Sequence, residues 1–296
     1  GVYDGTLARS KVRRKVEKAD CILALGAFLS DGSLGIYTSK LDDSKMIKAS
    51  SDSITIRYHD YPGVQLREFL EKLTRKLPKH YMEGVPKTRF AFAKPFKPQK
   101  NKPIKVKRFF TRLNEFLGGE TVVISDVGDS LYGAVDLTIH RRTEFLSPAY
   151  YTSMGFAIPA AIGAQINKRS LRPIVLVGDG AFQMTGQELS TIVRHNLNPI
   201  IFVLNNKGYI SERYIDDGPY NDIHEWAYHR MPEVLKSGWG CEVNTEGDLE
   251  EALAIAWKNK KSFSIINVQL DKEDASEALA RLGKRLSASA KPKRKS

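Results

Sequence analysis

The amino-terminal quarter of the chain alternates short apolar runs with segments of helical spacing. This pattern predicts helices over residues 7–19 and 64–77 and strands over 21–25, 46–49 and 54–58. An apolar run that ends at a glycine, as 21–25 does at Gly26, is typical of a buried parallel strand. Three candidate strands within about 75 residues predict the second half of a Rossmann-like domain rather than a complete one.

A second, longer region repeats the alternation from residue 104 onward. It predicts helices over 104–117, 153–167, 185–195, 232–237 and 248–259, and strands over 121–125, 173–177, 199–204, 241–244 and 263–268. Alternating strands and helices predict an α/β fold with a mostly parallel sheet and helices on both faces. Ligands bind such sheets beyond the carboxyl ends of the strands, so we expect chemistry in the loops after Ser125, Val177 and Leu204.

A basic segment without periodicity separates the two regions. Residues 78–103 contain five prolines and many lysines, which predicts an interdomain linker. The expected division is therefore 1–77 for the first domain, 78–103 for the linker, 104–275 for the second domain and 276–296 for a basic C-terminal tail. The last residues of that tail, 287–296, are low in complexity, and we expect them to be disordered.

The start of the chain lies in the middle of this topology. Its first residue is Gly1 rather than methionine, and the helix predicted at 7–19 follows almost at once. We therefore expect that a preceding part of the protein is missing from the sequence.

The composition excludes several classes of protein. Hydrophobic residues make up 42% and charged residues 27%, which excludes global disorder, collagen-like repeats and a coiled coil. The two cysteines, Cys21 and Cys241, form no C-x-x-C motif, so neither a disulfide framework nor a zinc module is expected. A reducing, cytoplasmic compartment fits best. Apolar runs fall short of the roughly 18 residues of a membrane span, so we expect no membrane partner.

The net charge of +12 invites comparison with nucleic-acid-binding proteins. Residues 72–112 carry net +13 and residues 281–296 add seven basic side chains, so the rest of the chain is net negative. A nucleic-acid-binding domain would carry its charge on a folded face. We expect no specific nucleic-acid partner, and nonspecific, salt-sensitive polyanion contact stays open as the alternative.

Two short motifs follow neighbouring apolar strands. Gly178-Asp179-Gly180 follows the strand at 173–177, and Asn205-Asn206-Lys207-Gly208 follows the next strand after a 24-residue interval. Glycines let the backbone approach a ligand closely, and carboxylate and amide oxygens suit magnesium or calcium. Because Mg²⁺ usually completes its shell with phosphate oxygens and water, a diphosphate is the natural ligand. Each motif alone is more typical of a plain turn.

Together, the motifs and their spacing resemble the signature of thiamine-diphosphate enzymes. The residues 181–189 and 208–212 are similar to the 2-keto acid decarboxylase branch, which includes pyruvate, indolepyruvate and phenylpyruvate decarboxylases. The resemblance implies that Asp179, the side-chain oxygen of Asn206 and the carbonyl of Gly208 hold Mg²⁺, which bridges the cofactor diphosphate. It also implies cofactor contacts from Gly178, Gly180, Ala181 and Tyr209.

The resemblance extends upstream to two further segments. Gly128-Asp129-Ser130 is similar to the family segment that lines the diphosphate and thiazolium, although a helix N-cap is an equal alternative for Asp129-Ser130. Asp126 stands where the family often has glutamate. In the segment Thr152-Ser153-Met154, the family pattern implies that the Thr152 carbonyl accepts from the cofactor's 4'-amino group. Met154 would wedge the cofactor into a bent shape, with simple core packing as the alternative.

Glu212 matches the decarboxylase glutamate that faces the substrate carboxylate. The resemblance implies that it assists the proton transfer that follows loss of carbon dioxide. An exposed helix carboxylate is the alternative for this residue.

The resemblance implies that 1–75 is the end of the family's middle domain and that 104–270 is its diphosphate-binding domain. The intact protein would then be a carboxy-lyase that converts a 2-keto acid, such as indolepyruvate or phenylpyruvate, to an aldehyde. The family's pyrimidine-binding domain is missing from this sequence and would come from an upstream region or another subunit of a homo-oligomer. We therefore expect this chain alone to be inactive. The alternatives are a partner-completed cofactor-binding subunit or a basic-tailed interaction module, and an acetolactate-type enzyme fits less well.

Overall fold

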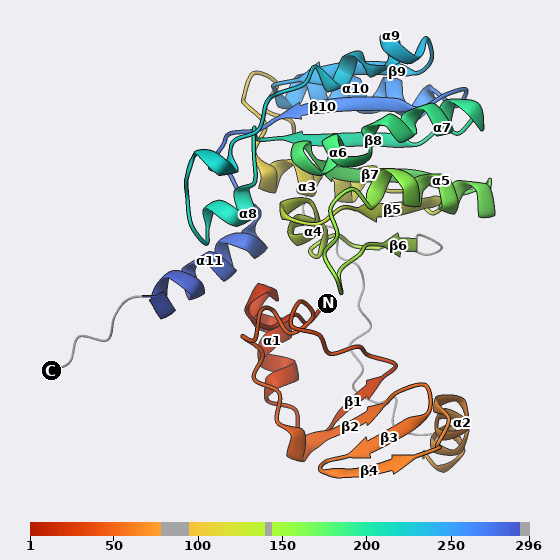
Figure 1. Ribbon diagram of the computed structural model, residues 1–296, viewed down its shortest axis with the longest axis vertical. Helices are drawn as coiled ribbons and strands as arrows, with labels where there is room; N and C mark the ends of the chain where they lie inside the picture. The colour runs from red at the N-terminus through yellow and green to blue at the C-terminus, as the bar shows by residue number, and fades with distance from the viewer. Residues whose placement is uncertain (78–94, 140–143, 291–296) are drawn as a thin grey trace, which may run out of the picture. The chain divides into compact units, whose positions relative to one another are not determined.

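The computed structural model describes residues 1–77, 95–139 and 144–290, with side chains described as far as residue 283. The chain forms two compact units, Gly1–Pro95 and Phe96–Ser296 (Figure 1). Most of the expected linker, at 78–94, lies outside the described residues. In the described part of the chain, none of the helices combines the length and apolar character needed to cross a bilayer.

The first unit holds a four-stranded sheet of order β1-β2-β3-β4. Its strands are β1 Ile22–Leu25, β2 Met46–Ala49, β3 Ser53–Ile56 and β4 His59–Pro62, and its α-helices are α1 Ser10–Glu17 and α2 Leu66–Lys76. Strands β1 and β2 are parallel, whereas β3 pairs antiparallel with both β2 and β4. The three predicted strands are present, but β1 is not buried as its apolar run predicted, because Leu23 and Leu25 are exposed. Strand β4 was not predicted because its four residues are exposed and show no apolar run.

The second unit holds a six-stranded, all-parallel sheet of order β6-β5-β7-β8-β10-β9 (Figure 1). Its strands are β5 Thr121–Ser125, β6 Glu144–Leu146, β7 Arg172–Gly178, β8 Ile200–Asn205, β9 Trp239–Val243 and β10 Ser264–Gln269. The predicted α/β class with a parallel sheet is confirmed. Strand β6 was missed because it is three residues long and only its middle residue is partly buried.

Helices cover both faces of this sheet. Apolar residues of α3 Val106–Phe116 and α10 Glu246–Lys258 pack on one face, and those of α5 Ala157–Asn167, α6 Asp179–Thr185 and α7 Leu189–Arg194 pack on the other. Strands β7 and β8 lie in the interior of the sheet, and their apolar side chains are buried on both sides. This burial explains the continuous apolar runs in the sequence.

The carboxyl end of the sheet carries short helices that the sequence pattern did not predict. Strand β5 leads to α4 Asp129–Ala134, β7 leads directly to α6, and β8 leads through a turn to α8 Ile210–Arg213. Each of these helices spans two turns or fewer, which is too short for a hydrophobic period to be recognised. Because the strands are parallel, their carboxyl ends meet at one edge of the sheet.

The expected tail and the end of the expected linker differ from the prediction. Helix α11 spans Glu277–Ala290, and Ala278, Leu279 and Leu282 on its first turns are buried. Residues 96–103 belong to the second unit, where the backbone N–H of Gln99 donates to Glu246 at 2.7 Å. The seven basic residues in 281–296 and the prolines and lysines in 96–103 obscured these contacts in the sequence pattern.

Arg172 connects the start of β7 to the end of α10. The residue is only 5% exposed, and its guanidinium donates to the carbonyls of Asn198, Ala256, Trp257 and Asn259 at 2.6–2.9 Å. The last carbonyls of a helix have no partner within the helix, so a buried cation there satisfies them and opposes the helix dipole. Burial lowers the pKa of Arg172 to about 10, and the side chain stays charged at neutral pH.

We predict that Arg172→Met destabilises the second unit by about 3 kcal/mol, because it leaves several buried carbonyls without donors. Urea unfolding followed by tryptophan fluorescence measures this, since all three tryptophans lie in this unit. Lys168→Met removes only an exposed ion pair with Glu144 and should cost less than about 1 kcal/mol. Equal losses for the two variants would contradict the role assigned to Arg172.

Candidate functional site

A cavity of about 400 Å³ opens at the carboxyl end of the six-stranded sheet. The turns that follow β5, β7 and β8 form its walls. Nearly all residues that the sequence singled out line it, namely Gly128, Asp129, Ser130, Thr152, Met154, Gly178, Asp179, Gly180, Ala181, Asn206, Gly208, Tyr209 and Glu212. Ser153 is the exception, because it is exposed and does not line the cavity.

Asp179 joins two of these turns. It is the first residue of α6 and is 1% exposed. Its Oδ1 accepts from the backbone N–H of Gly180 at 2.8 Å, and its Oδ2 accepts from that of Gly208 at 3.1 Å. Burial raises the pKa of Asp179 to about 6, although backbone hydrogen bonds oppose the rise. A buried carboxylate of this kind favours a nearby cation, because the cation stabilises its charged form.

The turn after β8 depends on Gly208. A Cβ atom at this position would lie 2.1 Å from the backbone oxygen of Asn221, and the backbone φ is +156°. The same Asn221 oxygen accepts from the N–H of Tyr209 at 2.9 Å. Glycine therefore allows the turn to pack against the segment at 219–222.

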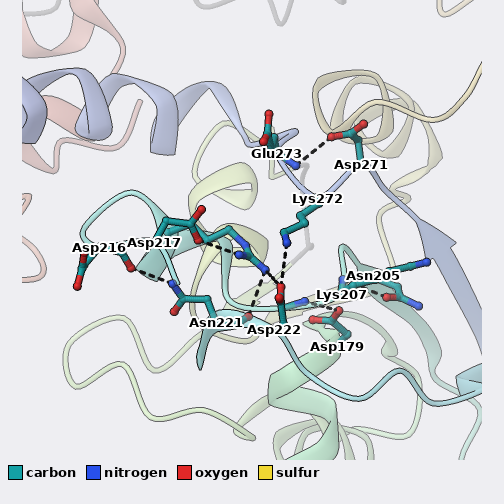
Figure 2. Close-up of polar contacts among 12 residues, drawn as sticks. Asp179, Asn205, Lys207, Asp216, Asp217, Asn221, Asp222, Asp271, Lys272 and Glu273 are labelled. Atoms are coloured by element: carbon teal, nitrogen blue, oxygen red, sulfur yellow. Dashed lines mark hydrogen bonds and ion pairs between the residues drawn. The ribbon is translucent and has the colours of Figure 1, made fainter. Parts of the chain in front are cut away.

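The two asparagines of the second motif face different surroundings. Asn206 is 9% exposed and lines the cavity. Asn205 is fully buried and donates from Nδ2 to Glu225 at 2.9 Å. Figure 2 shows Asp179, Asn205 and Lys207 on adjacent turns. The arrangement leaves the Asn206 side chain, with Asp179 and the Gly208 backbone, as candidate oxygen donors at one place.

An ion-pair network connects the turn after β8 with the segments that follow it in the chain. The Arg213 guanidinium is 8% exposed and pairs with Asp217 at 2.9 Å and also with Asp222. Lys272, which follows β10, reaches Asp222 at 3.1 Å (Figure 2). These contacts connect α8, which carries Glu212, with the segment after β10.

Asp126 organises the upstream wall without facing the ligand space. It is fully buried, and its carboxylate accepts from the backbone N–H groups of Val127, Gly155 and Ala157 at 2.8–3.2 Å. It thereby fixes the turn that precedes α5 and carries Met154. An aspartate can therefore occupy this position, because its carboxylate reaches the turn at 155–157.

Thr152 and Met154 lie on that turn. Thr152 has φ of +58°, a left-handed conformation that directs its backbone away from a regular strand or helix. Met154 is 37% exposed and lines the cavity, so it is not core filling. Thr185 donates from Oγ1 to the Gly155 carbonyl at 2.9 Å and ties the turn to α6.

Two buried polar atoms beside the cavity have no hydrogen-bond partner among the described residues: Asp129 Oδ1 and Ser211 Oγ. The other Asp129 oxygen accepts from the N–H of Ser276 at 2.8 Å, immediately before α11. Burial raises the pKa of Asp129 to about 6. Unsatisfied polar atoms beside a cavity indicate a polar ligand.

The residues present therefore fit a diphosphate with a divalent cation. Glycine backbones at the turns leave room for a close approach, Asp179 and Asn206 offer hard oxygen donors, and Ser211 offers a free hydroxyl. Sequence reasoning missed Ser211, although it directly precedes Glu212. It also missed Val106 and Leu270, whose place in the wall arises only from the packing of α3 and β10 around the turns.

Residues 126–268 match the family model described as thiamine pyrophosphate enzyme, C-terminal TPP binding domain. Residues 126–268 of the second unit are therefore similar to a TPP-binding domain, and the resemblance to thiamine-diphosphate-dependent 2-keto acid decarboxylases is confirmed. Pyruvate decarboxylase of Aspergillus fumigatus is 30% identical over 288 residues, which cover 94% of this chain and 51% of that protein. Alpha-keto-acid decarboxylase of Mycolicibacterium paratuberculosis is 29% identical over 299 residues, which cover 99% and 53%.

The chain thus spans about half the length of the curated relatives it matches. Among solved structures, the thiamine diphosphate-dependent 4-hydroxybenzoylformate decarboxylase of Rhodococcus jostii RHA1 aligns with a TM-score of 0.52 at 19% identity. The alignment covers 58% of this chain and 34% of that one. It supports the assignment of the fold.

We predict that Asp129→Asn changes stability in a pH-dependent way. The folded-state pKa of about 6 exceeds the ordinary value of 3.8, so the folded chain binds this proton more tightly than the unfolded chain. The stabilisation from this protonation is complete below pH 4 and is lost as pH rises through about 6. Because asparagine stays neutral, the variant should be more stable than the wild type at pH 7.5 by on the order of 2 kcal/mol, with little difference at pH 4.

Urea midpoints from tryptophan fluorescence at the two pH values provide the measurement. Asp271→Asn, which removes an exposed carboxylate after β10, is the control. A pH-independent difference for Asp129→Asn would contradict the prediction.

Proposed function

We propose that this chain carries the thiamine-diphosphate and Mg²⁺ site of a nonoxidative 2-keto acid decarboxylase. The observation that carries the proposal is the contact between Asp179 Oδ2 and the Gly208 N–H at 3.1 Å, which brings the two motif turns to one cavity. The TPP-binding-domain match and the decarboxylase relatives support the same chemistry. When bound, thiamine diphosphate supplies the electron sink for loss of carbon dioxide from a 2-keto acid.

The residues of the cavity divide into three groups in this proposal. Asp179, Asn206 and the Gly208 carbonyl hold the cation, and Gly128, Asp129, Ser130, Gly178, Gly180, Ala181 and Tyr209 surround the diphosphate. The Thr152 carbonyl would accept from the aminopyrimidine, and Met154 would pack against the cofactor. Ser153 contributes through its backbone position between these two residues rather than by lining the cavity.

Glu212 is the proposed proton-transfer residue. It lies on α8, is exposed at the cavity, and is held by its backbone N–H, which donates to Tyr209 at 3.1 Å. The ion pairs of its neighbour Arg213 fix the helix that presents it. A carboxyl group at the cavity can donate a proton in the step that follows loss of carbon dioxide.

The rest of the active site comes from outside this chain in our proposal. The curated relatives are about twice as long, which agrees with a pyrimidine-binding domain contributed by an upstream region or by another subunit of a homo-oligomer. The substrate is a 2-keto acid, with indolepyruvate and phenylpyruvate as bulky candidates. A cytoplasmic location fits the free thiols of Cys21 and Cys241.

A second candidate is a cofactor-binding subunit without catalysis of its own. This chain covers only 51% of the pyruvate decarboxylase it matches, and this favours a cofactor-binding subunit as the alternative. The sequence upstream of Gly1 distinguishes the two, because the decarboxylase proposal requires a pyrimidine-binding domain in frame or in a separate subunit.

We predict that Asp179→Ala abolishes Mg²⁺-dependent binding of thiamine diphosphate, because it removes the charged cation ligand. Isothermal titration of the chain with cofactor and Mg²⁺ measures this. The wild-type chain alone should bind weakly, since only part of the site is present, and tight binding would contradict a shared site. Asp52→Ala, in an exposed turn of the first unit, should bind as the wild type does. Unchanged binding by Asp179→Ala would remove Asp179 from the site.

We predict that Glu212→Gln spares cofactor binding but slows aldehyde formation by the intact enzyme about 10²- to 10⁴-fold, the range typical of a lost general acid. Steady-state assays on the assembled protein measure the rate. Glu233→Gln, which alters an exposed ion pair with Arg230, is the control and should retain full activity. Full turnover by Glu212→Gln would make this glutamate structural.

A further inference from the structure

Glu225 connects the turn after β8 with the end of β10. Its Oε1 accepts from Asn205 Nδ2 at 2.9 Å and from Gln269 Nε2 at 3.0 Å, and its Oε2 pairs with Lys207 Nζ at 3.3 Å. The residue lies in the segment between the short helices η4 Pro219–Asn221 and η5 Tyr228–Arg230. It does not line the cavity.

Two of these partners flank Asn206, the residue between them. Asn205 uses both ends of its amide, because its Oδ1 accepts from the N–H of Lys207 at 3.3 Å while its Nδ2 donates to Glu225. Lys207 has φ of +61°, a left-handed conformation that non-glycine residues rarely adopt. Such a conformation persists where the surroundings hold it in place. A single carboxylate thus holds both neighbours of Asn206.

Glu225 is itself held in position by a longer chain of polar contacts. Gln269 also donates to Glu242 at 3.1 Å, and Asn267 donates to the same Glu242 oxygen at 3.0 Å. These residues belong to β9 and β10, which pair with each other in the sheet. The carboxylate is therefore anchored on a strand other than the one whose turn it orients.

We propose that Glu225 is a positioning residue for the cation site: it holds the Asn205 amide, which in turn accepts from the backbone N–H of Lys207, and so fixes the turn that presents the Asn206 side chain and the Gly208 carbonyl. The inference rests on the proposed function. It adds a residue that touches neither the cation nor the cofactor. Groups that orient metal ligands commonly change metal affinity by 10- to 100-fold when they are removed.

The exposed ion pair and the buried hydrogen bond make different contributions. The side chains of Lys207 and Glu225 are 56% and 36% exposed, so their ion pair contributes little by itself. Asn205 is fully buried, and an unsatisfied amide there would be unfavourable. The hydrogen bond to Asn205 is therefore the contact through which Glu225 acts.

The test uses the full chain and four variants. Glu225→Met removes the contacts with Asn205, Gln269 and Lys207, whereas Glu225→Gln keeps an oxygen that can accept from Asn205. Lys207→Met removes only the ion pair, and Glu233→Gln, which changes an exposed ion pair on α9 Met231–Leu235, is the control. Mn²⁺ binding at saturating thiamine diphosphate is followed by the electron paramagnetic resonance signal of free Mn²⁺. Hydrogen exchange of the amides at 207 and 208 is measured without cofactor.

We expect Glu225→Met to weaken Mn²⁺ binding by about 10- to 100-fold and to accelerate exchange at 207 and 208 by about tenfold or more. Glu225→Gln and Lys207→Met should show effects of less than about fivefold, and the control should match the wild type. Rescue by Gln distinguishes positioning from a requirement for charge. If Glu225→Met fails to fold, Glu225→Ala replaces it, because it also removes the acceptor for Asn205. An effect of Glu225→Ala at least about tenfold larger than that of Lys207→Met supports the proposal, and equal effects of these two variants overturn it.

Two outcomes overturn the inference while leaving the proposed function intact. One is unchanged Mn²⁺ affinity in Glu225→Met, and the other is a loss of affinity without any change in exchange at 207 and 208. A wild-type chain that binds no Mn²⁺ with thiamine diphosphate contradicts the proposed function itself, and with it the role of Glu225 toward the cation.

Discussion

The buried carboxylate of Asp179 is the contact on which the candidate site depends. One oxygen holds the first turn of its own helix, and the other holds the backbone of Gly208 on the neighbouring turn. The contact exists because β7 and β8 are parallel neighbours, with Gly178 paired to Leu204, so that both strands end at the same level. The pairing of the strands thus brings the two motif turns together. The motifs themselves need only glycine, aspartate and asparagine at the strand ends.

The sequence was sufficient to predict this central part. Strands β5, β7, β8 and β10 are buried along nearly their whole length, so apolar residues predominate in each, with Asn267 interrupting the run in β10. Asp179 and Asn206 directly follow β7 and β8. Edge strands gave no such signal, because β4 is exposed and β6 is very short. Helices α4, α6 and α8 were missed for a related reason, since they are too short to repeat a hydrophobic period.

Contacts between distant parts of the chain were beyond the reach of sequence patterns. Asp129 was predicted to contact the cofactor or to cap a helix, yet one of its oxygens binds the Ser276 N–H, 147 residues further along the chain. Helix α11 was expected to be part of a tail because residues 281–296 carry seven basic side chains and no acidic one, whereas Leu279 and Leu282 on its first turns are buried. Glu225 had no motif to mark it, because its partners come from two other strands.

The two ends of β7 separate folding from chemistry. At its amino end Arg172 binds four carbonyls and closes α10, while at its carboxyl end Asp179 faces the cavity. The residues of β7 between these two ends are apolar and buried. They join Arg172 to Asp179 but make neither the carbonyl contacts of Arg172 nor the cavity contacts of Asp179. Substitutions around the cavity can therefore accumulate while the far end keeps the domain folded, which gives this architecture freedom to diversify its reactions over evolutionary time.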